Sequence, residues 1–146
     1  DGVLTVDMPP EEARDFHAEL KKVELDNIYL ISPTTTAARI RLIAELASGY
    51  LYYVSLKGVT GAGHLDVRSV SEKMALINSI TDLPVCVGFG IKDPESAKQI
   101  AQLADGAVVG SALIDKMAGS ETTEQALQQT IPFWASLRAA MDGTTH

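Results

Sequence analysis

Residues 84–112 have the sequence PVCVGFGIKDPESAKQIAQLADGAVVGSA, and this stretch decides the fold. It contains two short apolar runs, residues 84–87 and 106–109, and each is followed by glycines. Apolar residues between the runs recur with a helical period, and Asp93 followed by Pro94 is typical of a helix start. A strand, a helix and a second strand in this order predict a β-α-β unit with parallel strands. Because the runs are apolar at successive positions, we expect both faces of these strands to be buried.

The same alternation extends over the rest of the chain. Further strands are predicted over residues 2–6, 27–31 and 50–56, which gives five β-α units in all. The last helix, from about residue 123 to 141, contains Pro132, which predicts a kink or a break. The buried faces of the first three helices are predicted to be Phe16, Leu20 and Val23, then Ala38, Leu42 and Leu46 with Ile43 beside them, then Val70, Met74 and Ile77.

Two α/β architectures fit five such units. One is an open, doubly wound sheet, and the other is part of a (β/α)8 TIM barrel, whose active site lies on the loops after its strands. Three glycine-rich strand ends favour the barrel. The first residues already lie in an apolar strand pattern, and no initiator Met precedes them. We therefore expect residues 1–146 to be a single domain that supplies about the last five β-α units of a barrel, and to be a fragment.

Composition limits the classes of partner. The chain has 146 residues, 46% of them hydrophobic and 21% charged, with a net charge of -7. Nucleic acid is disfavoured as a partner because phosphate backbones require clustered Lys and Arg. The sequence has no apolar run near the ~20 residues of a membrane span, so we expect no membrane association. Cys86 is the only cysteine and is predicted to be a small core thiol; we expect no metal site and a cytoplasmic location.

Glycine-rich segments follow the third, fourth and fifth predicted strands. They are Gly58-Val59-Thr60-Gly61-Ala62-Gly63, Gly88-Phe89-Gly90 and Gly110-Ser111-Ala112. In a barrel the last two would lie after strands seven and eight, where a phosphate often binds on loops and the N-terminus of a short helix. The Ser111 hydroxyl could add a donor. These residues predict phosphate binding, although the glycines could instead only form tight turns.

Other residues near the strand ends allow two interpretations each. The loop from Lys57 to about Asp66 could close as a lid or be a surface loop, and Lys57 could meet a phosphate or water. Tyr52 could line a pocket for a flat apolar substrate or belong to the core, and Phe89 has the stronger claim to contact ligand. Asp7 could be functional or could cap the next helix. His17 is expected on a helix surface and His64 in the lid loop.

Taken together and in order, several motifs resemble the tryptophan synthase alpha subunit family. The likeness extends over nearly the whole chain, and the segment GVTGA with GFGI and GSA is rather specific. The motifs are Asp7-Met8-Pro9 with Glu11-Glu12, Gly58-Val59-Thr60-Gly61-Ala62, Gly88-Phe89-Gly90-Ile91, Pro94-Glu95 and Gly110-Ser111-Ala112.

This resemblance implies a carbon–carbon lyase of tryptophan biosynthesis, in which indole-3-glycerol phosphate is split to indole and glyceraldehyde 3-phosphate. Indole then passes to a beta subunit, in a heterotetramer, that uses pyridoxal phosphate, so no cofactor is expected in this chain. By matching position, phosphate would be bound by Gly61, Gly90, Gly110 and Ser111. The substrate pocket would be lined by Leu4, Tyr52 and Phe89, with Thr60 helping to close the lid.

The family's general acid and base are a Glu and an Asp on the first half of the barrel, and neither position exists here. The resemblance therefore implies no catalytic residue in this chain, and we expect it to be inactive alone. Two alternatives remain: another sugar-phosphate barrel, such as an isomerase or epimerase, and a non-enzymatic half-barrel that self-associates through its open edges.

Overall fold

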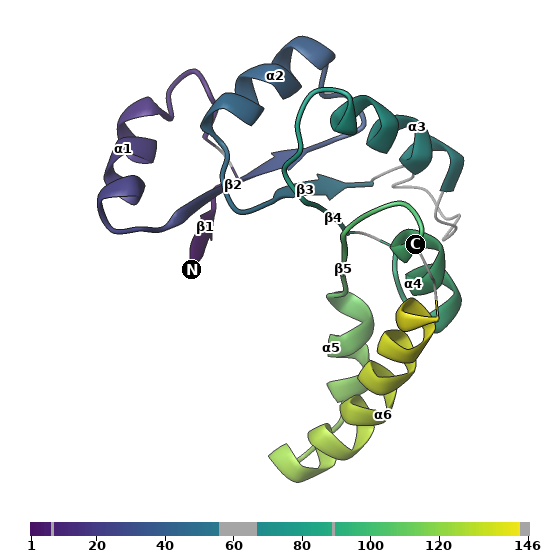
Figure 1. The fold of residues 1–146 in the computed structure, drawn as a ribbon. Coiled ribbons are helices and arrows are strands. Elements are labelled where there is room, and N and C mark those ends of the chain that lie inside the picture. The colour runs from purple at the N-terminus through teal and green to yellow at the C-terminus, as the bar shows by residue number, and fades with distance from the viewer. Residues whose placement is uncertain (7, 56–66, 89, 144–146) are drawn as a thin grey trace.

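The computed structural model describes residues 1–6, 8–55, 67–88 and 90–143 as alternating strands and helices. Five strands form one sheet in the order β1-β2-β3-β4-β5, and every neighbouring pair is parallel (Figure 1). The strands are β1 (Gly2–Leu4), β2 (Asp26–Ile31), β3 (Leu51–Val54), β4 (Val85–Gly88) and β5 (Gly106–Val108). Sequential order with parallel pairing is the topology of a barrel, and it differs from the doubly wound alternative, in which the strand order reverses.

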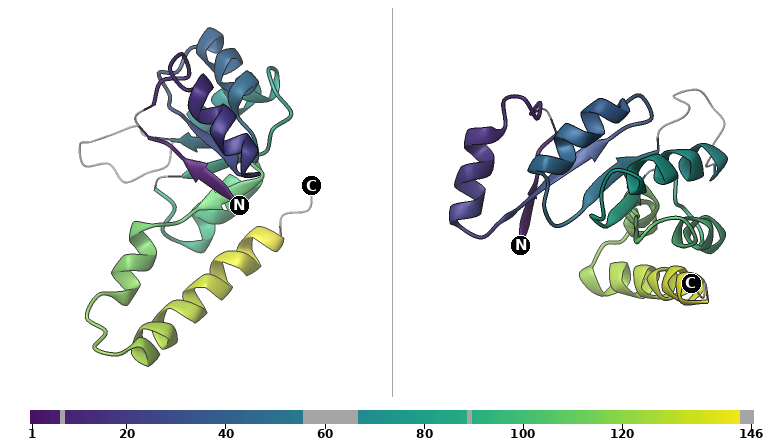
Figure 2. Two further views of the ribbon diagram at one scale, coloured as in Figure 1. Left: turned by 90° about the vertical axis from the view of Figure 1, so that its left-hand side faces the viewer. Right: turned by 45° about the horizontal axis from the view of Figure 1, so that its top comes forward.

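Helices follow the strands along one side of the sheet, and this side is its convex face (Figure 1). They are α1 (Arg14–Lys22), α2 (Ala37–Leu46), α3 (Val67–Asn78) and α4 (Pro94–Ala101). After β5 come the short α5 (Ser111–Met117) and the long α6 (Thr123–Asp142), which pack against each other, and α6 also packs against α4. Figure 2 shows this α5–α6 hairpin extending beyond the β5 end of the arc of strands.

The main core lies between the convex face and its helices. Strand residues of this face, including Ile31, Leu51, Tyr53 and Val87, are 0–1% exposed and contact the apolar sides of the helices. The predicted helix face of Val70, Met74 and Ile77 is confirmed. So is the start of α4, where the Asp93 side chain accepts a hydrogen bond from the Ser96 amide and Pro94 is the first residue.

Other predicted helix faces were partly wrong. α1 begins at Arg14, because residues 9–12 form a turn in which the Glu12 amide donates to the Pro9 carbonyl. The helix ends before Val23, which is therefore exposed. In α2 the buried residues are Ile40, Ile43 and Leu46, whereas Ala38 is exposed and Leu42 half-buried. The observed set recurs at i, i+3 and i+6, shares Leu46 with the predicted set, and turns the larger Ile40 side chain rather than Ala38 toward the core.

Pro132 does not break α6, which is continuous from Thr123 to Asp142 (Figure 2). Proline leaves the carbonyl four residues earlier, that of Gln128, without its helical partner. Both Pro132 and Gln128 are exposed, so solvent can bond that carbonyl. Of the predicted kink or break, the break was therefore wrong.

The prediction that β4 and β5 are buried on both faces was also wrong, because Cys86 and all of β5 are only half-buried. Tyr53 and Val87 on the convex face are buried, but Tyr52 and Cys86 on the opposite, concave face are only half-buried. The reason is that, in the part of the chain that the structure describes, no second layer packs across the concave face.

Candidate functional site

The carboxyl ends of β3, β4 and β5 surround a hollow of about 270 Å³ on the concave side of the sheet. Four predicted site residues line it together: Tyr52, Gly90, Gly110 and Ser111. They come from three consecutive parallel strands and the start of α5, so their convergence follows from the shared strand direction. Ile91 and Val108 also line this hollow, which we call the β3–β5 hollow, and were not singled out from the sequence.

Backbone geometry distinguishes the two glycines in the β3–β5 hollow. Gly90 has φ +80°, a conformation that side-chain-bearing residues rarely adopt, and a Cβ there would meet no atom within 4 Å. Gly90 is thus required for its backbone conformation rather than for space. Gly110 is the residue before α5, and the amides of Ser111 and Ala112 that follow it precede the first helical hydrogen bonds, which the Leu113 and Ile114 amides donate to the Gly110 carbonyl. The N-terminal helix dipole adds a partial positive charge at the same place.

Gly88 lies against the Tyr52 ring on the concave face. Its register partner on β3 is Val54, but a Cβ on Gly88 would overlap the Tyr52 hydroxyl. A second pair repeats this arrangement, because the Cys86 sulfur lies 2.7 Å from the place that a Cβ on Gly106 would occupy. Gly88 therefore leaves room for the Tyr52 ring.

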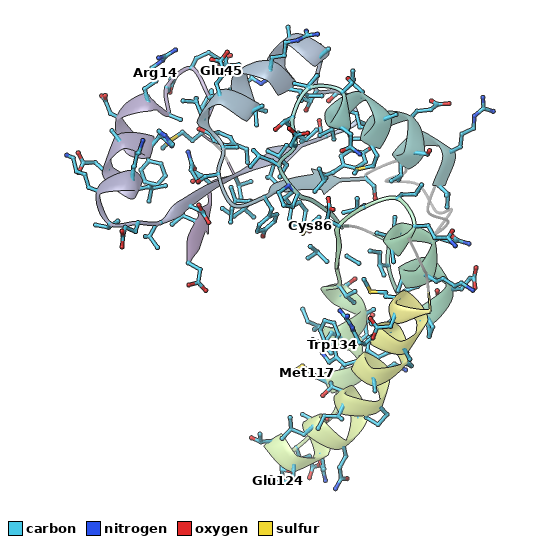
Figure 3. The ribbon with its side chains drawn as sticks, viewed as in Figure 1. Arg14, Glu45, Cys86, Met117, Glu124 and Trp134 are labelled. Atoms are coloured by element: carbon cyan, nitrogen blue, oxygen red, sulfur yellow. The ribbon has the colours of Figure 1, made fainter. Side chains whose placement is uncertain are left out.

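Tyr52 and Cys86 stand side by side in the register of β3 and β4. Burial raises the pKa of the Tyr52 phenol, and nearby Tyr50 and Cys86 raise it further. Burial also raises the pKa of the Cys86 thiol, with Asp105 adding to the effect. Both groups are consequently neutral near pH 7, so the phenol of Tyr52 can donate a hydrogen bond into the β3–β5 hollow. Figure 3 labels Cys86 near the middle of the arc.

Leu4 is placed apart from the other predicted pocket residues. It lies on β1, at the far edge of the sheet from β5, is 39% exposed, and is not among the described residues that line the β3–β5 hollow. Four more predicted positions, Gly61, Thr60, Phe89 and Asp7, lie outside the described residues, as do Lys57 and His64. His17 is half-buried in α1 rather than fully on the surface.

A second hollow, of about 320 Å³, lies at the carboxyl ends of β1 and β2. Val6 and Met8, on either side of Asp7 in the sequence, both line it. Its rim includes Arg39, whose guanidinium donates to both carboxylate oxygens of Glu11 at 3.0 and 3.3 Å. The described residues include no cluster of three or more His, Cys, Asp or Glu side chains that could bind a metal. No helix among them is long and apolar enough to cross a membrane.

Comparison with known proteins identifies a family for this chain. The family described as tryptophan synthase alpha chain matches residues 1–142. The tryptophan synthase alpha chain of Methylococcus capsulatus is 52% identical over 143 residues, and that of Burkholderia mallei is 49% identical. These alignments cover 97% and 98% of this chain, but 54% and 52% of those proteins. This chain thus spans about half the length of the curated relatives it matches.

Solved structures agree with the sequence comparison. The crystal structure of the tryptophan synthase alpha subunit of Legionella pneumophila superposes with a TM-score of 0.82 at 39% identity, over 99% of this chain and 53% of that one. A crystal structure of tryptophan synthase from M. tuberculosis in its aminoacrylate-bound form gives 0.79 at 29% identity, over 96% of this chain and 50% of the other. The five β-α units are therefore part of a TIM barrel, as predicted. The chain belongs to the tryptophan synthase alpha chain family.

Proposed function

We propose that this chain forms the phosphate-binding part of a tryptophan synthase alpha subunit, which cleaves indole-3-glycerol phosphate to indole and glyceraldehyde 3-phosphate. The observation that carries the proposal is the convergence of Tyr52, Gly90, Gly110 and Ser111 on one hollow in a chain of this family. The family match also favours the lyase over a sugar-phosphate isomerase or epimerase.

In this proposal the substrate's phosphate is bound at the start of α5. The amides of Gly110 and Ser111, which both line the β3–β5 hollow, would donate to it, and the Ser111 hydroxyl would add a donor. Gly90 brings a second stretch of backbone to the same hollow in a conformation with positive φ. This arrangement requires no lysine or arginine, which is consistent with the chain's net charge of -7.

The apolar part of the β3–β5 hollow would receive the indole ring. Tyr52, Ile91 and Val108 provide aromatic and aliphatic surface next to the phosphate donors. Thr60, Gly61 and Phe89 are proposed to complete the pocket, and Leu4 to approach it from β1 once the barrel is whole.

Cleavage of the carbon–carbon bond needs a general acid and a general base. We do not propose that residues of this chain supply either of them. We propose that they come from the half of the family's barrel that this chain does not match, so the chain alone is inactive. The beta subunit, with its pyridoxal phosphate, is the proposed protein partner, and a cytoplasmic location is proposed with it.

A chimaera tests the lyase directly. Residues 1–143 would replace the matching part of the Methylococcus capsulatus alpha chain, and indole release from indole-3-glycerol phosphate would be measured with the beta subunit present. We expect release by the chimaera and none by the 146-residue chain alone. A chimaera that folds but releases no indole would overturn the proposal.

The phosphate site has its own matched control. Gly90 and Gly119 have nearly equal φ values, +80° and +83°, and a Cβ on either would meet nothing within 4 Å. Gly90→Ala and Gly119→Ala should therefore strain the backbone equally, by roughly 1 kcal/mol. Only Gly90 lines the β3–β5 hollow, so only Gly90→Ala should raise the KM of the chimaera. Equal KM values for the two variants would remove Gly90 from the site.

A further inference from the structure

Lys73 on α3 differs from the other lysines that the structure describes, because its side chain is half-buried. The exposed ones are Lys21, Lys22, Lys92, Lys98 and Lys116. The Lys73 Nζ donates to the Thr35 carbonyl at 2.7 Å, and this hydrogen bond joins α3 to the turn before α2. Among the described residues no carboxylate lies within ion-pair distance of Lys73. Its ammonium group is therefore partly removed from water without an opposite charge to compensate for the lost hydration.

Lys73 lines a hollow of about 240 Å³ on the convex side of the sheet, which we call the α3 hollow. Tyr53, on the convex face of β3, forms part of its wall, whereas Tyr52 lines the β3–β5 hollow from the concave face. The sheet therefore separates the two hollows. The other residues that line the α3 hollow come from α3 and from the segment after β2, and they are Pro33, Ser69, Glu72 and Leu76.

The groups around Lys73 favour a neutral ligand over an anion. The Glu72 carboxylate lines the α3 hollow, and the Thr35 carbonyl already accepts a hydrogen bond from Lys73. Both groups present negatively charged oxygens, so a phosphate or carboxylate beside the Lys73 Nζ would be repelled by them.

The Lys73 amine is suited to react with a neutral carbonyl compound. Burial lowers the pKa of Lys73, so more of it is uncharged near neutral pH than of an exposed lysine. An uncharged, partly desolvated lysine amine is the form that attacks carbonyl carbons. The α3 hollow provides space for a small carbonyl compound next to this amine.

We propose that Lys73 is a modification site, at which small neutral aldehydes that enter the α3 hollow form an imine. The amine attacks the aldehyde carbon and a C=N bond forms, while the aldehyde oxygen takes both amine protons and leaves as water. No oxidant or reductant is consumed. Protonation of the imine by solvent restores a positive charge near Glu72 and one N–H that can donate to the Thr35 carbonyl. Acylation would instead leave a neutral amide, so the surroundings of Lys73 favour aldehydes over acyl donors.

Reductive trapping tests this proposal on the 146-residue chain. The chain is incubated near neutral pH with propanal and cyanoborohydride, which converts each imine to a propylated lysine, and peptide mass spectrometry gives the rate at each lysine. We expect Lys73 to react severalfold faster than the exposed lysines, and this preference to disappear in urea that unfolds the chain. Equal rates in the folded chain, or a preference that persists after unfolding, would overturn the proposal.

The charge of the aldehyde tests the choice of ligand. Glyoxylate carries a carboxylate next to its aldehyde group, so it should react at Lys73 no faster than at the exposed lysines. A preference for Lys73 that is as strong with glyoxylate as with propanal would contradict the selection of neutral aldehydes.

Two tryptophan variants of α3 test whether the reaction takes place in the α3 hollow. Leu76→Trp puts a larger side chain into it, whereas Ala75→Trp adds the same side chain at an exposed position that is not among its described lining residues. Leu76→Trp should slow the propylation of Lys73, and Ala75→Trp should leave the rate unchanged. Circular dichroism checks the fold of both variants, and the smaller formaldehyde should still react at Lys73 in both. Equal propylation rates of Lys73 in the two variants would mean that the α3 hollow does not admit the aldehyde. None of these measurements requires turnover, so they are independent of the proposed function.

Discussion

The two faces of the sheet differ in what they contact, although they are made by alternate residues of the same strands. On the convex face Leu51 and Val85 are 0% exposed beneath the helices. On the concave face their neighbours Tyr52 and Cys86 are half-buried and lie at or near the β3–β5 hollow. The convex face therefore contains the core that stabilises this chain, whereas the concave face contains the candidate site.

The largest expected effect comes from a cavity on the convex side. Leu51→Ala should lower the free energy of unfolding by about 2–5 kcal/mol, because a fully buried leucine loses its contacts and the core cannot collapse completely. Urea unfolding followed by circular dichroism would measure it. Leu4→Ala, at a 39% exposed position of β1, is the control and should cost less than about 1 kcal/mol. Equal costs would mean that the two faces do not differ as described.

The next effect tests how the concave face is packed. Gly88→Ala would place a methyl group where the Tyr52 hydroxyl lies, so Tyr52 must move, at a cost of about 1–3 kcal/mol. Tyr52→Ala in the same chain should relieve the clash, which makes the two changes strongly non-additive in a double-mutant cycle.

Gly90→Ala provides the contrast for that cycle. Its cost comes from positive φ and not from crowding, so Tyr52→Ala should not reduce it. If the free-energy changes of Gly88→Ala and Tyr52→Ala simply added, the clash between the two side chains would not contribute to stability.

The same difference between the faces explains which features were predictable from the sequence. Local signals gave the five β-α units, the Asp93-Pro94 start of α4 and the glycine-lined strand ends, because each depends on a few adjacent residues. The burial of Cys86 was overestimated because an apolar run does not show whether a second layer covers it. Periodicity also could not choose between Ala38 and Ile40 for the buried side of α2, since both sets recur at helical spacing.

The role of Gly88 shows a second limit. A glycine in a strand end is compatible with ligand approach, with a turn, and with a large neighbour. Only the position of the Tyr52 ring across the strand distinguishes these cases. Ile91 and Val108 were missed for a related reason: their place in the β3–β5 hollow depends on the registry of β4 with β5 and on the turn after β4, which no local pattern encodes.

A smaller effect is expected at the start of α4, on the convex side. The Asp93 carboxylate accepts from the Ser96 amide at 2.8 Å and from the Ser96 hydroxyl at 2.7 Å. Asp93→Ala should cost about 1 kcal/mol, as loss of an N-cap usually does. Asp93→Asn keeps a capping side chain and should be nearly neutral at pH 7.

The pH dependence of the free energy of unfolding should distinguish Asp93→Asn from the parent chain. The hydrogen bond from the Ser96 amide holds the pKa of Asp93 below its usual value. The unfolded pKa, about 3.9, is therefore the higher one, and the stabilisation present above it is lost as the pH falls through the lowered folded value. Unfolding at pH 7 and pH 3 should show a larger loss on acidification for the parent chain than for Asp93→Asn. The same loss for both would mean that the carboxylate is not responsible.

The smallest expected effect is at the outermost layer of the convex side. Arg39 and Glu11 join α2 to the turn before α1, but their side chains are 44% and 52% exposed. A double-mutant cycle with Arg39→Ala and Glu11→Ala should give a coupling of about 0–1 kcal/mol, reduced in 1 M salt. The exposed Arg68–Glu72 pair of α3, at 3.1 Å, is the control and should give no more than about 0.5 kcal/mol. A coupling at Arg39 well above that range would instead mean that the hollow at the ends of β1 and β2 excludes water, because only a desolvated pair of this geometry interacts so strongly.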